Sequence, residues 1–244
     1  MPPASYTPPP PAEKASIWED FIDIFYQPAE VFRRRADGRF GLALLLLTVL
    51  FAVIFYFTQD SLAPIMDQEI AKATERMRAA NPNMTEEQAA GAMAMGRKFA
   101  IVNITLYMPI VILLLGTLLW LVGKFFDSAA SWKQATTIAA YAQFPRIVEG
   151  IVNGVQGAML DASSLTSRYA IQLGPARFLD DQNTNPVVLA LLGRLDVFTI
   201  WITVLIGIGL VVIGGVSKAR AAIMAALIWL LGSTFYIYTA LKQR

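Results

Sequence analysis

Five stretches of this chain are too long and too apolar for the core of a water-soluble protein. Each approaches or exceeds the ~20 residues that a helix needs to cross a hydrocarbon layer of about 30 Å. Inside lipid every backbone polar group must be satisfied internally, and a helix does this within one segment. The sequence therefore predicts an all-α, polytopic integral membrane protein with five transmembrane helices, at about 40–58, 99–122, 135–158, 195–216 and 221–241.

Composition supports this prediction and narrows the functional classes. Hydrophobic residues make up 56% of the chain and charged residues 16%, whereas soluble domains have about 45–50% and about 25%. A net charge of +2 gives no basic surface for nucleic acid. The chain has no histidine and no cysteine, which removes thiol chemistry and most metal sites. We expect no enzymatic activity, no catalytic residue, no cofactor, no metal and no nucleic-acid partner.

The first 15 residues differ from the rest. They are rich in proline and lack the basic and apolar regions of a secretory signal peptide. We predict a disordered, Pro-rich cytoplasmic tail over 1–15 and one five-helix membrane domain over 16–244.

An amphipathic surface helix is predicted at Trp18–Arg35. Ser16 and Glu19 have the spacing of a capping box. Apolar residues recur at helical spacing and Pro28 interrupts them, so we expect a kink. Its apolar side could lie in the membrane interface or pack on the bundle, and the sequence leaves both open. The expected anchor residues are Trp18, Phe21, Phe25, Phe32, Arg33, Arg34 and Arg35.

Basic residues predict the orientation. Arg33, Arg34, Arg35 and Arg39 immediately precede the first apolar stretch. The positive-inside rule places that side, and the amino terminus, in the cytoplasm. Five crossings would put the carboxyl terminus on the opposite side.

The first long outer loop is predicted to contain an extramembrane helical hairpin. Pro64 can start a helix that Asn81-Pro82 stops, and Thr85 with Gln88 has a second capping-box spacing. We expect the second transmembrane helix to project beyond the bilayer and pair with the helix before it.

The third apolar stretch is the least suited to lipid, because Tyr141, Pro145, Arg146 and Glu149 all fall within it. Arg146 and Glu149 are spaced i, i+3 and can pair, and a single mid-membrane charge costs about 2.5–3.5 kcal/mol. Pro145 removes a helical hydrogen bond beside them and predicts a kink. The pair could fix helix packing, form part of an ion or proton path, or face a partner.

Helix packing is predicted at four positions. Gly150 and Gly154 form a GxxxG pair that lets another helix approach closely. Trp201 lies deep in the fourth stretch and is expected to pack between helices, with Gly209 along the same stretch.

Several segments together resemble the Yip-domain family of Rab/Ypt-interacting membrane proteins. The segments are FYQPAEVFRR before the first stretch, YAQFP in the third, LDVFTIWITVLIGIGL in the fourth and VSKARA after it. The resemblance implies five helices and a cytoplasmic amino terminus. Eukaryotic relatives are similar to adaptors that bind prenylated small GTPases. This chain lacks their long cytosolic region and is similar to compact bacterial forms, which implies the bacterial inner membrane and leaves small-GTPase binding in doubt.

These observations predict a non-enzymatic membrane scaffold or accessory subunit, with interaction surfaces but no reactive side chains. The expected interaction surfaces are the Trp18–Arg35 helix, the outer helical hairpin and the small-residue face at Gly150 and Gly154. Its partners would be the lipid bilayer and either another membrane protein, as in a transport or trafficking complex, or a second copy in a homo-oligomer. A small transporter or channel that uses the polar third stretch is the alternative, and a membrane-shaping protein is a further one.

Overall fold

A computed structural model describes residues 16–181 and 183–241, without the side chains of residues 97, 98 and 100–105. The predicted tail at 1–15 and the end of the chain at 242–244 lie outside the described residues. Within them the chain forms helices and no strand, which confirms the all-α prediction. In chain order the helices are α1 (Ile17–Tyr26), α2 (Pro28–Arg34), α3 (Gly41–Thr58), α4 (Ala63–Ala80), α5 (Glu86–Lys124), α6 (Trp132–Ala142), α7 (Pro145–Met159), η1 (Ala162–Ser164), η2 (Arg168–Ile171), η3 (Pro175–Phe178), α8 (Pro186–Leu192), η4 (Gly193–Leu195), α9 (Val197–Val212) and α10 (Lys218–Leu241).

Three helices in the described part of the chain are long and apolar enough to cross a membrane. They are α3, the Leu106–Lys124 part of α5, and α10. A fourth crossing is possible if the segment Pro186–Leu195 and α9 are taken together, although they meet at an angle of 57°. Length and composition therefore support at least three of the five predicted spans.

The predicted third span is two helices rather than one kinked helix. α6 ends at Ala142, a turn follows at Gln143 and Phe144, and Pro145 is the first residue of α7. Pro145 has no N–H to continue the helix, and the first position of a new helix is where this loss costs least. All of α6 from Ala135 to Ala142 is buried in the bundle, so this segment does not need the apolar surface of a lipid-facing span.

The predicted surface helix is also divided in two. Gln27 leaves the helical conformation (φ −134°, ψ 53°), and Pro28 begins α2. The predicted capping box of Ser16 and Glu19 is present at the start of α1. The break turns α2 relative to α1 so that both helices contact the bundle.

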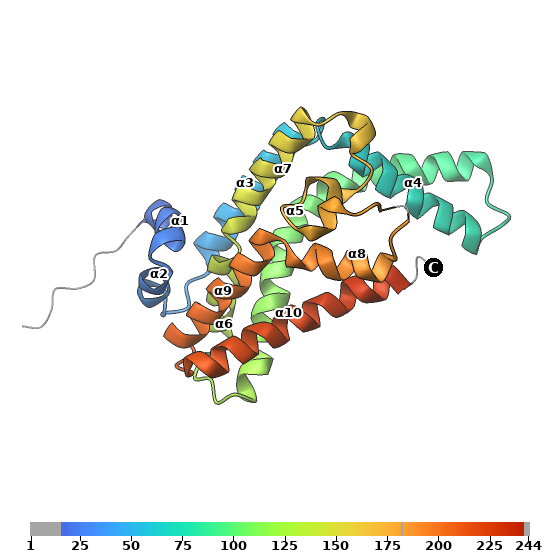
Figure 1. Ribbon diagram of the computed structural model, residues 1–244. Coiled ribbons are helices and arrows are strands. Elements are labelled where there is room, and N and C mark those ends of the chain that lie inside the picture. Colours follow the sequence, from blue (N-terminus) through green and yellow to red (C-terminus); the bar gives the residue numbers. More distant parts are fainter. Residues whose placement is uncertain (1–15, 182, 242–244) are drawn as a thin grey trace, which may run out of the picture.

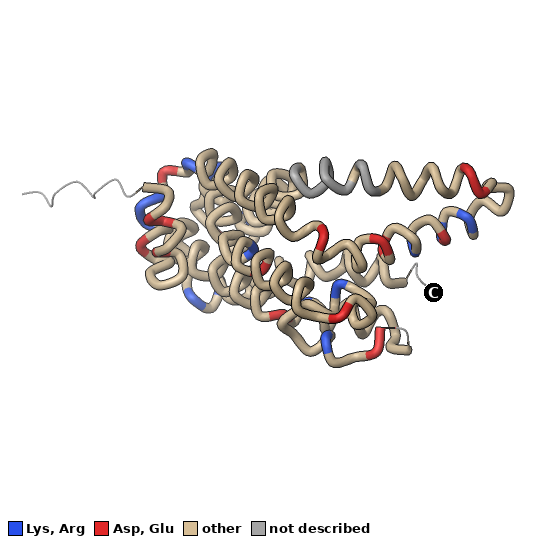
Figure 2. The backbone as a smooth tube through the Cα atoms, turned by 90° about the horizontal axis from the view of Figure 1, so that it is seen from above, with Lys and Arg blue, Asp and Glu red and all other residues tan. Residues whose placement is uncertain are grey.

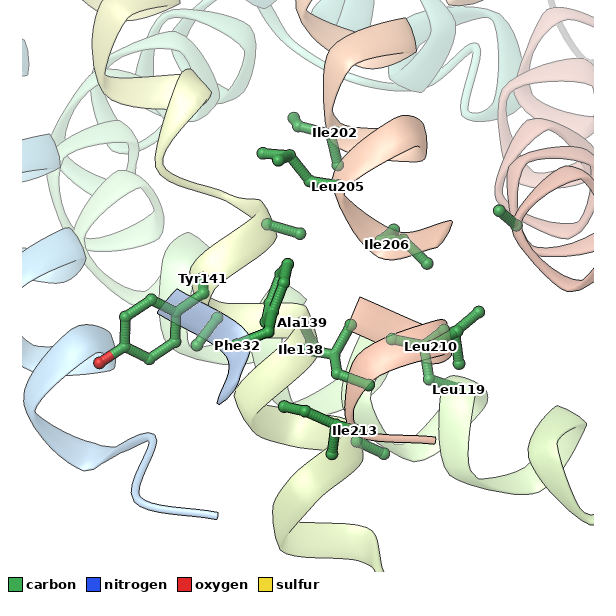
Figure 3. Close-up of a cluster of buried hydrophobic side chains, with 14 of the residues drawn as sticks. Phe32, Leu119, Ile138, Ala139, Tyr141, Ile202, Leu205, Ile206, Leu210 and Ile213 are labelled. Carbon is green, nitrogen blue, oxygen red and sulfur yellow. The ribbon is translucent and has the colours of Figure 1, made fainter. Parts of the chain in front are cut away.

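The core of the bundle surrounds α6 (Figure 3). Ile138 and Ala139 of α6 are fully buried and face α9, and Leu119 approaches from α5. Phe32 reaches the same cluster from α2. The contribution of α9 is a row of residues at helical spacing, Ile202, Leu205, Ile206 and Leu210, followed by Ile213. α5 and α9 pack directly on α6, and α2 reaches the same cluster through Phe32, so α6 lies at the centre of the bundle.

α7 packs closely on α3 through its glycines. A β-carbon at Gly154 would lie 2.1 Å from Cγ2 of Thr58, and one at Gly150 would lie 3.2 Å from Cγ2 of Ile54. The GxxxG pair is thus covered by a helix of the same chain. This corrects the expectation that these glycines offer a face for a partner protein.

Gly154→Ala is expected to lower the free energy of unfolding by about 1–3 kcal/mol, because the added methyl group cannot fit beside Thr58. The Thr58 side chain is short, and its hydroxyl donates to Ile54 O at 2.8 Å, so the backbones must move apart. Gly91→Ala is the matched control, since a β-carbon there meets nothing within 4 Å. Thermal unfolding in detergent measures both, and equal midpoints would contradict the close approach.

The loops lie at two ends of the bundle (Figure 1). We name the end with α1, α2 and the turns at 125–131 and 213–217 the inner end, after the orientation that the basic residues predict. Ala129 N donates to Gly214 O at 3.0 Å, and Arg220 pairs with Asp127 at 3.1 Å. The outer end, opposite, has α4, the loop at 160–185 and α8. Charged residues gather at these ends, and the middle of the bundle carries few (Figure 2).

The predicted outer hairpin is present. α4 and the first part of α5 lie side by side and project beyond the rest of the bundle (Figures 1 and 2). α4 ends at Asn81, and Thr85 and Gln88 form the predicted capping box of α5. A β-carbon at Gly96 would lie 3.3 Å from the Ile70 side chain, so the two helices pack closely there.

Candidate functional site

Arg146 and Glu149 form an ion pair inside the bundle. Both lie on the first turns of α7, where the break at Pro145 aims this face toward α9. The Arg146 guanidinium hydrogen-bonds to Glu149 and also approaches Thr199 Oγ1 at 3.4 Å. Their side chains are only 21% and 14% exposed, so the structure brings this predicted pair together in an enclosed place.

Arg194 lies near this pair, although the sequence did not mark it as a site. It belongs to η4, the short link between α8 and α9, and Asp196 behind it caps α9 by accepting from Thr199 N at 2.8 Å. Arg194 Nε donates to Ser233 Oγ of α10 at 3.3 Å. Its guanidinium lies 5.9 Å from the Trp229 ring and 5.2 Å from the Tyr236 ring.

These residues line a cavity of about 190 Å³, named here the polar cavity. A second cavity of about 260 Å³ at the outer end shares four of its lining residues, Arg168, Tyr169, Ala190 and Tyr236. The polar cavity therefore lies directly beside the cavity at the outer end. Its lining is Tyr107, Arg146, Glu149, Arg168, Tyr169, Gln172, Ala190, Gly193, Arg194, Asp196, Thr199 and Tyr236.

The chemistry of the polar cavity is that of fixed charges and hydrogen-bond donors. Among the residues that the structure describes, no three His, Cys, Asp or Glu side chains lie close enough together to hold a metal ion. The lining offers three guanidiniums and two carboxylates. It is suited to holding charge rather than to nucleophilic attack.

Asp20 joins the surface helices to the bundle. The side chain is fully buried and contacts Arg35 Nε at 2.5 Å and Arg34 at 3.1 Å. Tyr141 of α6 donates to the same carboxylate at 3.3 Å. We call Asp20, Arg34, Arg35 and Tyr141 the docking cluster.

Burial and pairing act in opposite directions in the docking cluster. Burial raises the pKa of the Asp20 carboxyl, and the hydrogen bond and charge of Arg35 offset only part of that effect. Burial also opposes the charge of Arg35, but its contacts with Asp20 prevail and raise the pKa of the guanidinium. Removing one member would therefore leave the others poorly compensated.

Aromatic contacts complete the docking of the surface helices. Phe21 packs edge-on against Phe144, with 5.2 Å between the ring centroids, and Phe25 packs in the same way against Trp201, also with 5.2 Å between the centroids. Phe32 is fully buried. Trp18 points the other way and is 56% exposed. The sequence left open whether the apolar side of these helices lies in the membrane interface or packs on the bundle. In the structure the main apolar side packs on the bundle.

The remaining predicted residues are distributed over several contacts. Tyr141 does not join Arg146 and Glu149 but turns toward the inner end, because the helix break separates their faces. A β-carbon at Gly209 would lie 2.7 Å from Ile138, so α9 and α6 meet closely there. Arg33 pairs with Glu30 at the surface, whereas Arg34 and Arg35 are used in the docking cluster.

A shallow groove runs along the outside of α9 and α10. Its volume is about 640 Å³, and small side chains form much of its lining. Ala222 and Ala226 of α10 are exposed there, and Arg33 and Lys218 lie at its inner end. We call this surface the small-residue groove; its lining is Ala29, Arg33, Thr203, Val204, Gly207, Ile208, Val211, Val212, Lys218, Ala221, Ala222, Ala225 and Ala226.

Sequence reasoning missed Asp20 and Arg194 as site residues. Asp20 follows Ile17 by three residues and precedes Ile24 by four, and this place on the apolar stripe signals burial, although an acid in the first turn of a helix is also typical of an exposed residue. For Arg194 no local pattern gives a comparable signal, since its partners Ser233 and Tyr236 lie about forty residues away.

Long apolar helices packed in one bundle, with charged residues at both ends, define an integral membrane protein. The family model of the Yip1 domain matches residues 22–239, so the chain belongs to the Yip1 domain family. This confirms the resemblance carried by the four sequence segments. No curated protein and no solved structure matched the chain in these comparisons.

Proposed function

We propose that this Yip1 domain protein is a non-enzymatic membrane scaffold or accessory subunit of a transport or trafficking complex. In this proposal it binds the transmembrane helix of another membrane protein, or of a second copy of itself, in the small-residue groove. Small residues let helix backbones approach closely in lipid, where helices associate by packing and hydrogen bonding. The observation that carries the proposal is this groove, on a surface left uncovered by the chain's own helices.

The topology belongs to the same proposal. We place the inner end in the cytoplasm of a bacterial cell and the protein in its inner membrane. α3, α5, the α6–α7 pair, the α8–α9 pair and α10 would then make five crossings, and the carboxyl terminus would lie outside. The clustering of Arg33, Arg34, Arg35 and Arg39 at the inner end supports this orientation. Labelling of single cysteines introduced at the outer hairpin tests it.

The groove can be tested by filling it. Ala222→Leu with Ala226→Leu is expected to weaken partner association by about tenfold or more, since overpacking typically costs about 1–3 kcal/mol. Both positions are exposed, so the fold should persist. Leu231→Trp, an enlargement on an exposed part of α10 outside the groove, is the control. Crosslinking after mild detergent extraction measures the association.

Two outcomes would count against the scaffold. A strictly lone monomer with no reproducible partner would remove the proposal altogether. Equal crosslinking by the filled-groove variant and by Leu231→Trp would show that the interface does not lie along α9 and α10. The outer hairpin, with its exposed Met93 and Met95, would then be the surface to test.

The polar cavity supports a second candidate, a small transporter or channel. A second cavity, which shares four lining residues with it, lies beside it at the outer end. Toward the inner end, however, Ile138, Ala142 and Phe144 are all fully buried, so passage would need a second conformation. Flux in reconstituted vesicles that disappears in a folded Glu149→Gln protein would favour this candidate over the scaffold.

Membrane shaping is the remaining alternative. The outward side of α1 exposes Trp18, Ile22 and Tyr26, which is the apolar surface that an interfacial helix inserts among lipid headgroups. Remodelling of vesicles by the purified protein, lost in Trp18→Ser with Tyr26→Ser, would support it.

A further inference from the structure

Arg194 carries hydrogen-bonding capacity that the described part of the chain does not use. A guanidinium has five N–H donors, and the protein contacts of Arg194 are one hydrogen bond to Ser233 and the faces of Trp229 and Tyr236. Among the ion pairs of the described residues, none includes Arg194. Its remaining donors are available to a molecule in the polar cavity, which Arg194 lines.

The charge balance of the polar cavity also favours an anion. Arg146, Arg168 and Arg194 line it against two carboxylates. Glu149 is paired with Arg146, and Asp196 accepts from the Thr199 N–H. The guanidiniums of Arg168 and Arg194 lie over one ring, that of Tyr236, at 5.4 Å and 5.2 Å. Like charges so placed in a bundle repel, and an anion held between them would remove that cost.

An apolar groove continues from the same arginines. It has a volume of about 320 Å³ and shares Tyr107, Arg146, Arg194, Thr199 and Tyr236 with the polar cavity. Its apolar lining comes from α5, α9 and α10, and we call it the α5–α10 groove. Leu114 at its edge is 66% exposed, so the groove opens on the exposed side of the bundle. Its apolar residues include Leu114, Leu115, Leu118, Ile202, Ile206 and Ile228.

We propose that the polar cavity and the α5–α10 groove together hold one anionic phospholipid, with its phosphate at Arg194 and one acyl chain along the groove. Guanidinium forks match phosphate oxygens in geometry as well as in charge. A free phosphate would use the polar cavity alone and leave the groove without a role. A zwitterionic lipid would bring its own cation toward three arginines. Charge complementarity at one end and apolar continuity at the other therefore select an anionic amphiphile.

Binding of defined lipids to the purified full chain in a nonionic detergent tests this proposal. Phosphatidylglycerol, phosphatidylcholine and inorganic phosphate are titrated separately, with bound lipid counted by native mass spectrometry and affinity measured from thermal shifts. One phosphatidylglycerol should bind at least about tenfold more tightly than phosphatidylcholine. Arg194→Gln should weaken it by about 10- to 100-fold, as expected for charged hydrogen bonds. Arg220→Gln, which changes an exposed arginine at the inner end, should leave binding unchanged.

A second variant separates the lipid from a free anion and does not disturb the charges. Leu114→Trp adds bulk at the exposed edge of the α5–α10 groove, so it should weaken phosphatidylglycerol without affecting inorganic phosphate. Three results overturn the proposal: equal affinity for the two lipids, unchanged phosphatidylglycerol binding in a folded Arg194→Gln protein, or inorganic phosphate that binds as tightly as the lipid. The small-residue groove shares only Thr203 and Ala225 with the α5–α10 groove, and neither Arg194 nor Leu114 lines it. These results therefore leave the scaffold proposal to its own test.

Discussion

Asp20→Ala is expected to lower the free energy of unfolding by about 3 kcal/mol, the low end of what removing one partner of a buried charge cluster costs. The change leaves Arg34 and Arg35, which are only about one-fifth exposed, without their shared carboxylate. It also removes the acceptor of the buried Tyr141 hydroxyl. For a domain of this size the thermal midpoint in detergent should fall by about 6–12 °C.

The matched control for Asp20 is its neighbour Asp23. The Asp23 side chain is 32% exposed and pairs with Arg34 alone, so Asp23→Ala should cost less than about 1 kcal/mol. Protease cleavage within α1 and α2 should become faster in Asp20→Ala and remain slow in Asp23→Ala. If both variants melt alike, Asp20 does not fasten the surface helices to the bundle.

Glu149→Ala should have an effect of similar size, about 3 kcal/mol, because it leaves Arg146 unpaired inside the bundle. Replacing both residues by leucine should cost less than the sum of the single changes, since no lone charge then remains. The exchange Arg146→Glu with Glu149→Arg should recover part of the loss. Thermal unfolding of the single, double-leucine and exchanged variants in one detergent measures these differences.

This set of variants also tests what the pair does. Stability and partner crosslinking that return together in the exchanged protein indicate a packing role. Normal stability without partner crosslinking would show that Arg146 and Glu149 have a further role. If the double-leucine variant loses as much stability as the two single changes added together, Arg146 and Glu149 do not stabilise each other as an ion pair.

Features set by neighbouring residues could be predicted from the sequence. The predicted capping boxes of Ser16 and Thr85 are both present. Each depends on side chains that reach only two or three residues along the chain. The apolar helices α3 and α10 were predicted for the same reason, because continuous hydropathy is a local property.

Features set by distant residues could not be predicted. Pro145 predicts a kink, but whether the chain bends or starts a new helix depends on the packing of α6 among α2, α5 and α9. Asp20 and Tyr141 are 121 residues apart, and Arg194 and Ser233 are 39 residues apart. Their meeting follows from the assembled bundle, and no spacing rule within one helix anticipates it.

Photo-crosslinking from position 222 in native membranes tests the scaffold proposal most directly. A photoreactive residue at Ala222 lies in the small-residue groove, and one at Leu231 lies on exposed α10 surface outside it. We predict a reproducible protein adduct from position 222, either with another membrane protein or with a second copy of this chain, and none from position 231. Lipid adducts alone from both positions would contradict the account.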